Sequence, residues 1–371
     1  MLIGVPKEIK NNEFRVGLVP SSVRELIANG HQVMVQRDAG TAIGFANATY
    51  EQIGAIIVDT AAEIFAKADM VVKVKEPQPE ECRLLREGQI LFTYLHLAPD
   101  PEQAHLLQQS GCIAIAYETV TNRHGGLPLL APSSEVAGRM AIQAGAHCLE
   151  MMNKGSGILL GGVPGVPPAK VVVIGGGVLG TNAVRVAVGM GAQVVVIERS
   201  LERLYQLDVQ FGSRVTTIYS TADSIEEYVT DADLVVGAVL VPGAAAPRLV
   251  THDMIKKMRQ GSVMVDPSID QGGCFETSRP TTHEEPTYII DGIVHYCVTN
   301  MPGAVPRTSA LALNNATLPF TLALANHGCV PALQRDPHLL NGLNIFKGKI
   351  TYKAVAEALQ KPYVEAVQVL Q

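Results

Sequence analysis

Short apolar runs alternate with segments of helical spacing along most of the chain, beginning with residues 2–5, 21–29 and 32–35. This alternation of strand and helix is typical of a parallel sheet that is covered by helices. Further strands are predicted where apolar runs recur, at 70–74, 90–93, 112–117, 215–219, 234–236 and 263–265. The pattern therefore predicts an α/β fold of doubly wound, Rossmann-like parallel sheets.

Two later segments break this alternation. Ser133 or Ser134 is expected to cap a long helix that leads into a second domain. Residues 309–326 predict a largely apolar helix, and residues 327–371 are expected to add one or two short helices. We expect this tail to return to the first domain, because the segment before it belongs to the second.

The stretch 171–198 carries the most informative pattern in the chain. An apolar run enters a glycine turn, continues at helical spacing and ends in a second apolar run, which predicts a βαβ unit. Gly175, Gly177 and Gly180 satisfy G-x-G-x-x-G, in which the glycines allow a tight turn, close approach to a pyrophosphate and close helix packing. Glu198 ends the second strand, about 20 residues beyond the turn, where an acid accepts hydrogen bonds from an adenosine ribose. This order predicts an NAD site.

The alternative interpretation of this stretch is purely structural. A glycine-rich turn can simply allow a helix to lie close to a sheet. That interpretation accounts for Gly180 but leaves Glu198 unexplained.

Composition limits the class of protein. With 371 residues, the chain is long enough for two domains. Hydrophobic residues make up 47% and charged residues only 17%, and this low charged fraction is compatible with surface that is buried between subunits. A net charge of -6 and the lack of any basic cluster argue against a nucleic-acid partner. No secretory signal or apolar run of ~18 residues is found, so we expect a soluble, cytoplasmic protein without membrane contact.

Cysteine and histidine spacing argues against a metal site. The six cysteines include no C-x-x-C pair, which favours reduced thiols in the core over disulfides. The histidines form no H-E-x-x-H or comparable pattern of ligands. We therefore expect no catalytic metal.

Four polar residues are candidates for chemistry in a cleft between the two domains. His96, Lys75 and Asp270 each follow a predicted strand, and Arg15 lies in a loop after the first strand. Ligands of α/β proteins bind beyond the carboxyl ends of sheet strands. A hydrogen-bonded structural histidine and ordinary surface charges at strand ends remain the alternatives for these four residues.

Long motifs give the chain a resemblance to a known family. They are GVPKEIKNNEFRVGLVP at 4–20, LPLLAPSSEVAGRMAIQAGA at 127–146, GGVPGVPPAKVVVIGGGVLGTNA at 161–183, and DQGGCFETSRPTTHEEPTYIIDGIVHYCVTNMPGAVPRTSALALNNATLP at 270–319. Together they resemble the L-alanine dehydrogenases, in the family that also includes the pyridine nucleotide transhydrogenases. The resemblance covers nearly the whole chain. It implies a discontinuous substrate domain at 1–128 and 307–371, and an NAD-binding domain at 129–306.

The resemblance also implies an activity. It is the reversible, NAD-dependent oxidative deamination of L-alanine to pyruvate and ammonium, in a homohexamer. Hydride would leave the alanine Cα, and an imine would be hydrolysed through a carbinolamine. Arg15 and Lys75 would bind the substrate carboxylate, with the keto oxygen as an alternative partner of Lys75. His96 would act as general acid and base, and Asp270 would be the second group that handles protons.

The cofactor site is implied in the same way. Ser134 would contact the phosphate or nicotinamide end, the turn from Gly175 to Gly180 the pyrophosphate, and Glu198 the adenosine ribose. The remaining positions that the resemblance assigns to the cofactor are Val178, Leu179, Arg203, Ser220, Val239, Leu240, Ile269, Arg279, Asn300 and Met301.

Glu198 departs from the family pattern, which usually has Asp at this position. A carboxylate still repels a 2'-phosphate, so we predict NAD over NADP, although Arg199 follows directly. Two other functions remain open. One is a soluble, transhydrogenase-like subunit that binds NAD(H), and the other is a catalytically silent NAD sensor.

Overall fold

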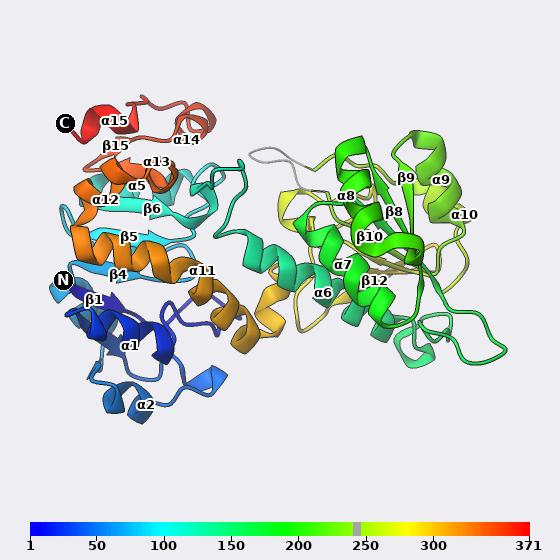
Figure 1. Cartoon of the computed structure of the whole chain (residues 1–371), viewed down its shortest axis with the longest axis horizontal. Coiled ribbons are helices and arrows are strands. Elements are labelled where there is room, and N and C mark those ends of the chain that lie inside the picture. Colours follow the sequence, from blue (N-terminus) through cyan, green and yellow to red (C-terminus); the bar gives the residue numbers. More distant parts are fainter. Residues whose placement is uncertain (240–245) are drawn as a thin grey trace. The chain divides into compact units, whose positions relative to one another are not determined.

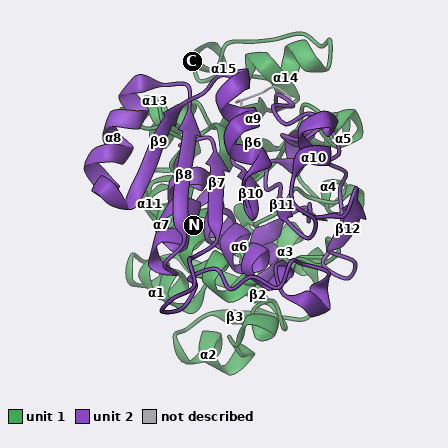
Figure 2. Cartoon of the chain, turned by 90° about the vertical axis from the view of Figure 1, so that its right-hand side faces the viewer, with its two compact units in different colours: residues 1–132, 305–371 green, residues 133–304 purple. Residues whose placement is uncertain are grey.

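The computed structural model describes residues 1–239 and 246–371. The chain divides into two compact units, unit 1 with residues 1–132 and 305–371 and unit 2 with residues 133–304 (Figure 2). Leu240, one of the predicted cofactor contacts, lies outside the described residues. Each unit is built on its own sheet with helices packed on both faces (Figure 1).

The sheet of unit 1 has eight strands in the order β15-β14-β6-β5-β4-β1-β2-β3. The six parallel strands are β1 (Leu2–Val5), β2 (Gln32–Gln36), β3 (Ile56–Val58), β4 (Met70–Val72), β5 (Ile90–Thr93) and β6 (Ile113–Ala116). Two antiparallel strands, β14 (Leu343–Phe346) and β15 (Lys349–Ile350), complete one edge.

Both faces of this sheet are buried, because alternate residues of a strand enter different cores. Val33 and Val35 of β2 join one core, whereas Met34 between them joins the other. The first core contains residues of α1 (Pro20–Ala28), α2 (Asn47–Gln52), α11 (Pro306–His327), α12 (Cys329–Arg335) and α13 (Pro337–Leu340). The second core contains residues of α3 (Ala61–Lys67), α4 (Pro79–Cys82), α5 (Pro101–Ser110) and α14 (Lys353–Ala358), and α15 (Ala366–Val369) ends the chain.

The sheet of unit 2 has seven strands in the order β12-β13-β11-β10-β7-β8-β9. They are β7 (Lys170–Ile174), β8 (Gln193–Glu198), β9 (Val215–Tyr219), β10 (Leu234–Gly237), β11 (Val263–Val265), β12 (Thr287–Ile290) and β13 (Ile293–Tyr296). One face packs on α6 (Ala131–Cys148), α7 (Val178–Gly189) and α8 (Leu201–Phe211), and the other on α9 (Ala222–Thr230) and α10 (His252–Lys257). All neighbouring strands are parallel except β12 and β13.

The predicted fold of doubly wound α/β sheets is confirmed, but three details of the prediction are wrong. Both sheets are mixed, because β12, β14 and β15 run antiparallel at their edges. The tail after α11 contains two strands in addition to short helices. Ser133 and Ser134 lie inside α6, which begins at Ala131, and so they do not cap it.

The direction of winding reverses once in each sheet. In unit 1 the first strand β1 is flanked by β2 and β4, and in unit 2 β7 is flanked by β8 and β10. Connections leave the two central strands of such a sheet in opposite directions, so their carboxyl ends border an open crevice. The loops after β1 and β4, and those after β7 and β10, are therefore the places where ligands are expected.

Candidate active site

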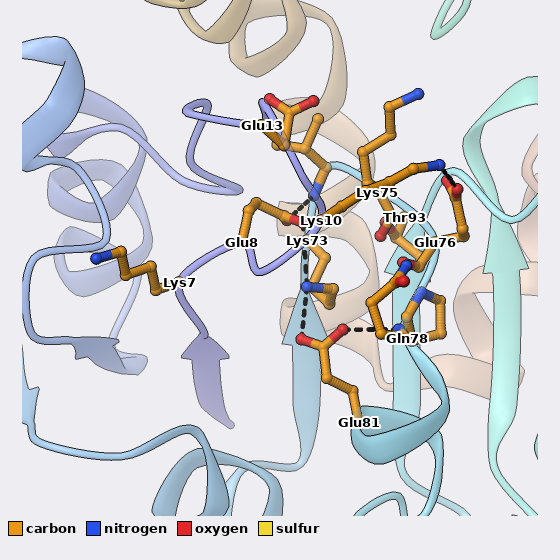
Figure 3. A network of polar contacts seen from close by, with 12 residues as sticks. Lys7, Glu8, Lys10, Glu13, Lys73, Lys75, Glu76, Gln78, Glu81 and Thr93 are labelled. Carbon is orange, nitrogen blue, oxygen red and sulfur yellow. Dashed lines mark hydrogen bonds and ion pairs between the residues drawn. The ribbon is translucent and has the colours of Figure 1, made fainter.

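Unit 1 places charged residues at the reversal point of its sheet. The loop after β1 carries Arg15. The same loop carries Glu8 and Glu13, and Lys73 and Lys75 directly follow β4 (Figure 3). β1 and β4 are parallel neighbours, so both segments leave the same edge of the sheet. The structure thus brings the two predicted substrate-binding residues, Arg15 and Lys75, to one loop cluster.

Arg15 is fixed by Glu13, two residues before it. The Nε and Nη2 atoms of Arg15 each donate to a different oxygen of Glu13 at 2.7 Å, and both side chains are buried. Burial opposes the charge on Glu13, but the hydrogen bonds and charge of Arg15 outweigh it and hold the pKa of Glu13 below its usual range. A planar guanidinium held in this way presents a fixed orientation to a ligand.

Lys75 carries an ammonium group with no partner among the described side chains. Its side chain is partly buried and points away from the neighbouring Lys10–Glu76 ion pair (Figure 3). Burial lowers the pKa of Lys75, and the nearby charge of Arg15 adds to that effect, partly against the attraction of Glu76. A buried cation without a counterion is energetically unfavourable, so this position suits an anionic ligand.

His96 follows β5, the strand beside β4, and is half exposed. Its φ of 49° lies in the left-handed region that residues other than glycine rarely adopt. Glu118 holds this conformation, since it accepts the amide of His96 at 2.7 Å and lies 3.9 Å from the ring Nδ1. The rings of Tyr94 and His96 are stacked, with 5.8 Å between their centroids.

The sequence interpretation missed Glu13, Tyr94 and Glu118, which orient the predicted residues of unit 1. Tyr94 also lies close enough to Arg15 to act on its pKa. Glu13 could have been recognised as a carboxylate two residues before an arginine. Glu118 offered no such signal, because it reaches His96 from the end of the next strand, β6.

The glycine turn of unit 2 has the geometry that its motif requires. Gly175 has a φ of 101°, and a Cβ there would lie 2.5 Å from the carbonyl oxygen of Ala238. A Cβ on Gly180 would lie 1.8 Å from the carbonyl oxygen of Gly175. By contrast, a Cβ on Gly177 would meet no described atom within 4 Å. Two glycines therefore serve packing, and the third borders open space at the start of α7.

The start of α7 is suited to a phosphate group. Its N-cap is Gly177, and no side chain of residues 1–239 or 246–371 caps its first amides. Unpaired amides and the helix dipole together favour an anion at this end. The residues present therefore fit the pyrophosphate of a dinucleotide.

Glu198 and Arg203 both form hydrogen bonds with the backbone of the glycine turn. Glu198 accepts the amide of Gly176 at 2.7 Å, and its other oxygen accepts the amides of Arg199 and Ser200 at 2.8 and 2.9 Å. Arg203 donates from Nε to the carbonyl oxygen of Gly176 at 2.6 Å. A carboxylate has about four acceptor positions, so these bonds leave Glu198 the capacity to accept from a ribose hydroxyl.

The other predicted cofactor residues follow different strands of the unit 2 sheet, at the edge where α7 begins. Ser220 follows β9, Val239 follows β10, Ile269 follows β11, and Asn300 and Met301 follow β13. Ile269 and Met301 are buried, and Val239 is half-buried. Arg279 is exposed, and its guanidinium carbon lies 4.2 Å from the centroid of the Tyr288 ring. Ser134 lies in the first turns of α6.

Asp270 is exposed on a short 3-10 turn (Ile269–Gln271) after β11. Asp266, which was also not predicted from the sequence, shapes the loop that carries Asp270. The fully buried carboxylate of Asp266 accepts the amides of Ser268 at 3.1 Å and Cys274 at 2.7 Å. Burial raises the pKa of Asp266, against the hydrogen bonds that lower it. Asp270 belongs to unit 2, whereas Arg15, Lys75 and His96 belong to unit 1.

The described part of the chain holds neither a metal-binding cluster nor a membrane-spanning helix. No group of three His, Cys, Asp or Glu side chains there could hold a metal ion. None of the helices built from described residues has the length and apolar character needed to cross a bilayer. All six cysteines are free thiols, as predicted.

The fold and the glycine turn define a dinucleotide-binding α/β protein of the dehydrogenase type. Known families extend this assignment. The model of the alanine dehydrogenase/PNT N-terminal domain matches residues 4–137, and that of the alanine dehydrogenase/PNT C-terminal domain matches residues 141–353. The chain belongs to the alanine dehydrogenase/PNT family.

Individual relatives agree with this membership. The chain is 58% identical over 370 residues to an alanine dehydrogenase of Halomonas elongata, and the match covers 100% of both chains. A solved structure of an L-alanine dehydrogenase covers 97% of this chain and 99% of its own, with a TM-score of 0.94 and 52% identity. A transhydrogenase from Sinorhizobium meliloti has a TM-score of 0.81 at 23% identity, covers 95% of this chain and 100% of its own, and shows the fold alone.

Proposed function

We propose that this chain is an NAD-dependent alanine dehydrogenase, which converts L-alanine and NAD reversibly to pyruvate, ammonium and NADH. Full-length relatives named alanine dehydrogenase support the substrate. The observation that carries the proposal is the paired guanidinium of Arg15 beside the unpartnered ammonium of Lys75, because two fixed cations at a sheet's reversal point suit a small carboxylate.

Arg15 and Lys75 would each make its own contact with the substrate. Arg15, whose guanidinium Glu13 holds in one orientation, would bind the substrate carboxylate through charge-assisted hydrogen bonds. Lys75 binds the same carboxylate or, in the reverse direction, the keto oxygen of pyruvate. The carboxylate would supply the counterion that Lys75 lacks among the described side chains, whereas the keto oxygen would accept a hydrogen bond from the ammonium.

Proton transfer is assigned to His96 and Asp270. His96 takes the proton from the amino group of alanine and later moves protons during hydrolysis of the imine and carbinolamine. Its Nδ1 faces Glu118, which leaves Nε2 as the nitrogen that acts on the substrate. Asp270 is assigned the second proton transfer in this proposal.

The cofactor is held by unit 2 in this proposal. The amides at the start of α7 bind the pyrophosphate, Glu198 binds the adenosine ribose, and Ser134, Val178, Leu179, Arg203, Ser220, Val239, Ile269, Arg279, Asn300 and Met301 complete the site. NAD, when bound, supplies the acceptor for the hydride of the alanine Cα. Residues 1–128 with 307–371 then serve as the substrate domain, and residues 129–306 as the NAD-binding domain.

A purified-protein assay tests the proposal. L-alanine and NAD are mixed with the chain at alkaline pH, and NADH is followed by its absorbance. Steady NADH production that depends on L-alanine is expected. NAD(H) binding without turnover would instead favour a transhydrogenase-like subunit or a silent sensor, and would contradict the proposed activity.

We further propose a cytoplasmic homohexamer. The family resemblance supplies the number of subunits, and the 17% of charged residues is compatible with extensive subunit contacts. Analytical ultracentrifugation measures the mass directly. Sedimentation as a monomer of 39.5 kDa would contradict the hexamer.

A further inference from the structure

Three buried charged side chains, those of Glu8, Lys73 and Glu81, form a cluster that includes the residue two positions before Lys75. The ammonium of Lys73 is fully buried and contacts Glu81 at 2.8 Å and Glu8 at 3.1 Å (Figure 3). The three residues come from the end of β4, the α4 helix and the loop after β1. The cluster therefore joins the loop after β1 to the segment 73–81, and Glu8 and Lys73 are 65 residues apart in the sequence.

Glu8 uses its two oxygens for two different tasks. Oε2 accepts from the Lys73 ammonium, and Oε1 accepts from the amide of Val74 at 2.7 Å. One carboxylate thus holds both the side chain of Lys73 and the backbone of the residue before Lys75. Any movement of Glu8 would be transmitted to the segment 73–75.

Other hydrogen bonds fix the same segment from the neighbouring strands. Tyr117 donates its hydroxyl to the carbonyl of Lys73 at 3.0 Å, and Thr93 donates its hydroxyl to the carbonyl of Lys75 at 2.9 Å. The amide of Tyr94 donates to the carbonyl of Val74 at 3.3 Å. The backbone that carries Lys75 is therefore held on several sides, while the Lys75 ammonium itself has no described partner.

Stability alone does not account for this cluster. Taking charges out of water is costly, and apolar residues of similar volume often give equal or greater stability than a buried ion pair. Burial raises the pKa of Glu8, against the charge of Lys73, which indicates that the site is unfavourable for a carboxylate. What charged groups do provide here is fixed geometry, because each hydrogen bond restricts direction as well as distance.

We propose that Glu8, Lys73 and Glu81 form a positioning device, which sets the place of the Lys75 ammonium and so determines affinity for the substrate carboxylate. This inference rests on the proposed function of Lys75. None of the three residues touches the substrate in this scheme. Their effect on the reaction passes through the backbone of residues 73–75.

Substitutions of Glu8 test the inference in the full-length protein. Glu8→Met removes the bond to Val74 and leaves Lys73 and Glu81 as a balanced pair, so no buried charge is left alone. We expect its KM for L-alanine to rise at least ~10-fold, because a misplacement of about 1 Å can be that costly. The KM for NAD should stay within about twofold, since binding in unit 2 is not altered.

A conservative variant and a matched control separate position from stability. Glu8→Gln keeps an oxygen for the Val74 amide, and we expect a KM for L-alanine within about threefold of wild type. Gln89→Met removes buried hydrogen bonds to Phe65 and Ala68 at the opposite end of β5, and should lower thermal stability without raising either KM. Thermal unfolding followed by circular dichroism compares the stability of all variants.

The outcomes are distinct. A folded Glu8→Met protein with an unchanged KM for L-alanine, or with parallel increases in both KM values, would overturn the inference. If Glu8→Met does not fold, Glu8→Asp decides, because its shorter carboxylate cannot reach both partners, and the KM should rise at least ~3-fold. An inactive wild type would remove the proposed function itself, whereas an active wild type with unaffected variants would remove only the positioning role.

Discussion

At the scale of single residues, His96 combines an unusual backbone with a predicted chemical role. Its φ of 49° is energetically unfavourable for a side chain with a Cβ, and such strain is concentrated at functional sites. Glu118 maintains it by accepting the amides of both Leu95 and His96. The strained position therefore supports the assignment of His96 to proton transfer.

Replacement of His96 should affect turnover more than binding. We expect His96→Ala to lower kcat for alanine oxidation by ~100-fold or more, the typical contribution of a general acid and base. His147→Ala is a matched control, because His147 is an exposed histidine on α6 that has no role in the proposed site. Turnover of His96→Ala within about tenfold of wild type would contradict the assignment.

The Glu13–Arg15 pair makes a prediction about pH. The pKa of Glu13 is lowered in the folded protein, so its contribution to stability is present at neutral pH and is lost as pH falls through that lowered pKa. We expect Glu13→Gln to reduce the free energy of unfolding by roughly 3 kcal/mol at pH 7, since it leaves a buried guanidinium without its counterion.

Denaturant unfolding of wild type and Glu13→Gln at several pH values checks this prediction. The difference between the two proteins should begin to shrink below the pH at which glutamate takes up its proton in the unfolded chain, and should be smallest once folded Glu13 is protonated at its lowered pKa. A difference that grew as the pH fell would show that the sign of the pKa shift is wrong.

At the scale of elements, the turn between β7 and α7 distinguishes glycines for packing from a glycine for a ligand. Gly177 has a φ of -66°, which alanine adopts readily, and a Cβ there has free space in the described chain. We expect Gly177→Ala to fold as well as wild type but to raise the KM for NAD by about tenfold, equivalent to ~1.4 kcal/mol of lost binding. Steady-state kinetics at saturating L-alanine give this value.

Gly189→Ala is the matched control for this experiment. Gly189 lies at the other end of the same helix, and an added Cβ there also meets no described atom within 4 Å. Alanine at this position should leave the KM for NAD unchanged and could only improve helix propensity. Equal effects of the two substitutions would argue against a phosphate site at the start of α7.

The two antiparallel hairpins at the sheet edges, β12–β13 and β14–β15, were not predicted from the hydrophobic pattern. Asp291 and Gly292 have φ values of 50° and 78° and join the antiparallel strands β12 and β13. This Asp-Gly turn is a strong local signal for a hairpin, but the surrounding polar segment suggested only loops. Lys347 and Gly348 join β14 and β15 in the same way, and lysine gives a weaker signal than Asp or Asn.

At the scale of the whole molecule, the proposed site makes a prediction about cofactor choice. A Glu198 carboxylate that binds the adenosine ribose would repel a 2'-phosphate, so we expect NADP to be a poor substrate. Initial rates with NAD and with NADP measure this choice. Equal kcat/KM values for the two cofactors would contradict the role of Glu198 and would direct attention to Arg199.

The features that were predicted are those formed by residues that lie close together in the sequence. The glycine turn and Glu198 lie within one βαβ unit, so their spacing identifies the cofactor site directly. Lys73 and Glu8 are 65 residues apart, and only the pairing of β1 with β4 brings them together. A single sequence carries no local sign of such a contact, which is why the positioning residues were not predicted although Lys75 was.

Unit 2 is one continuous stretch of chain, whereas unit 1 is closed by residues from both ends. During synthesis, unit 2 would need no residue from outside its own stretch, whereas β6 pairs with β14, which is translated after the whole of unit 2. We therefore expect a fragment of residues 133–304 to unfold cooperatively by itself, and a fragment of residues 1–132 to remain unfolded or to aggregate through its open sheet edge. Circular dichroism of the two fragments compares them, and the reverse result would refute this order. Unit 2 would then reach its native state before the residues that precede it in the chain, although these are translated earlier.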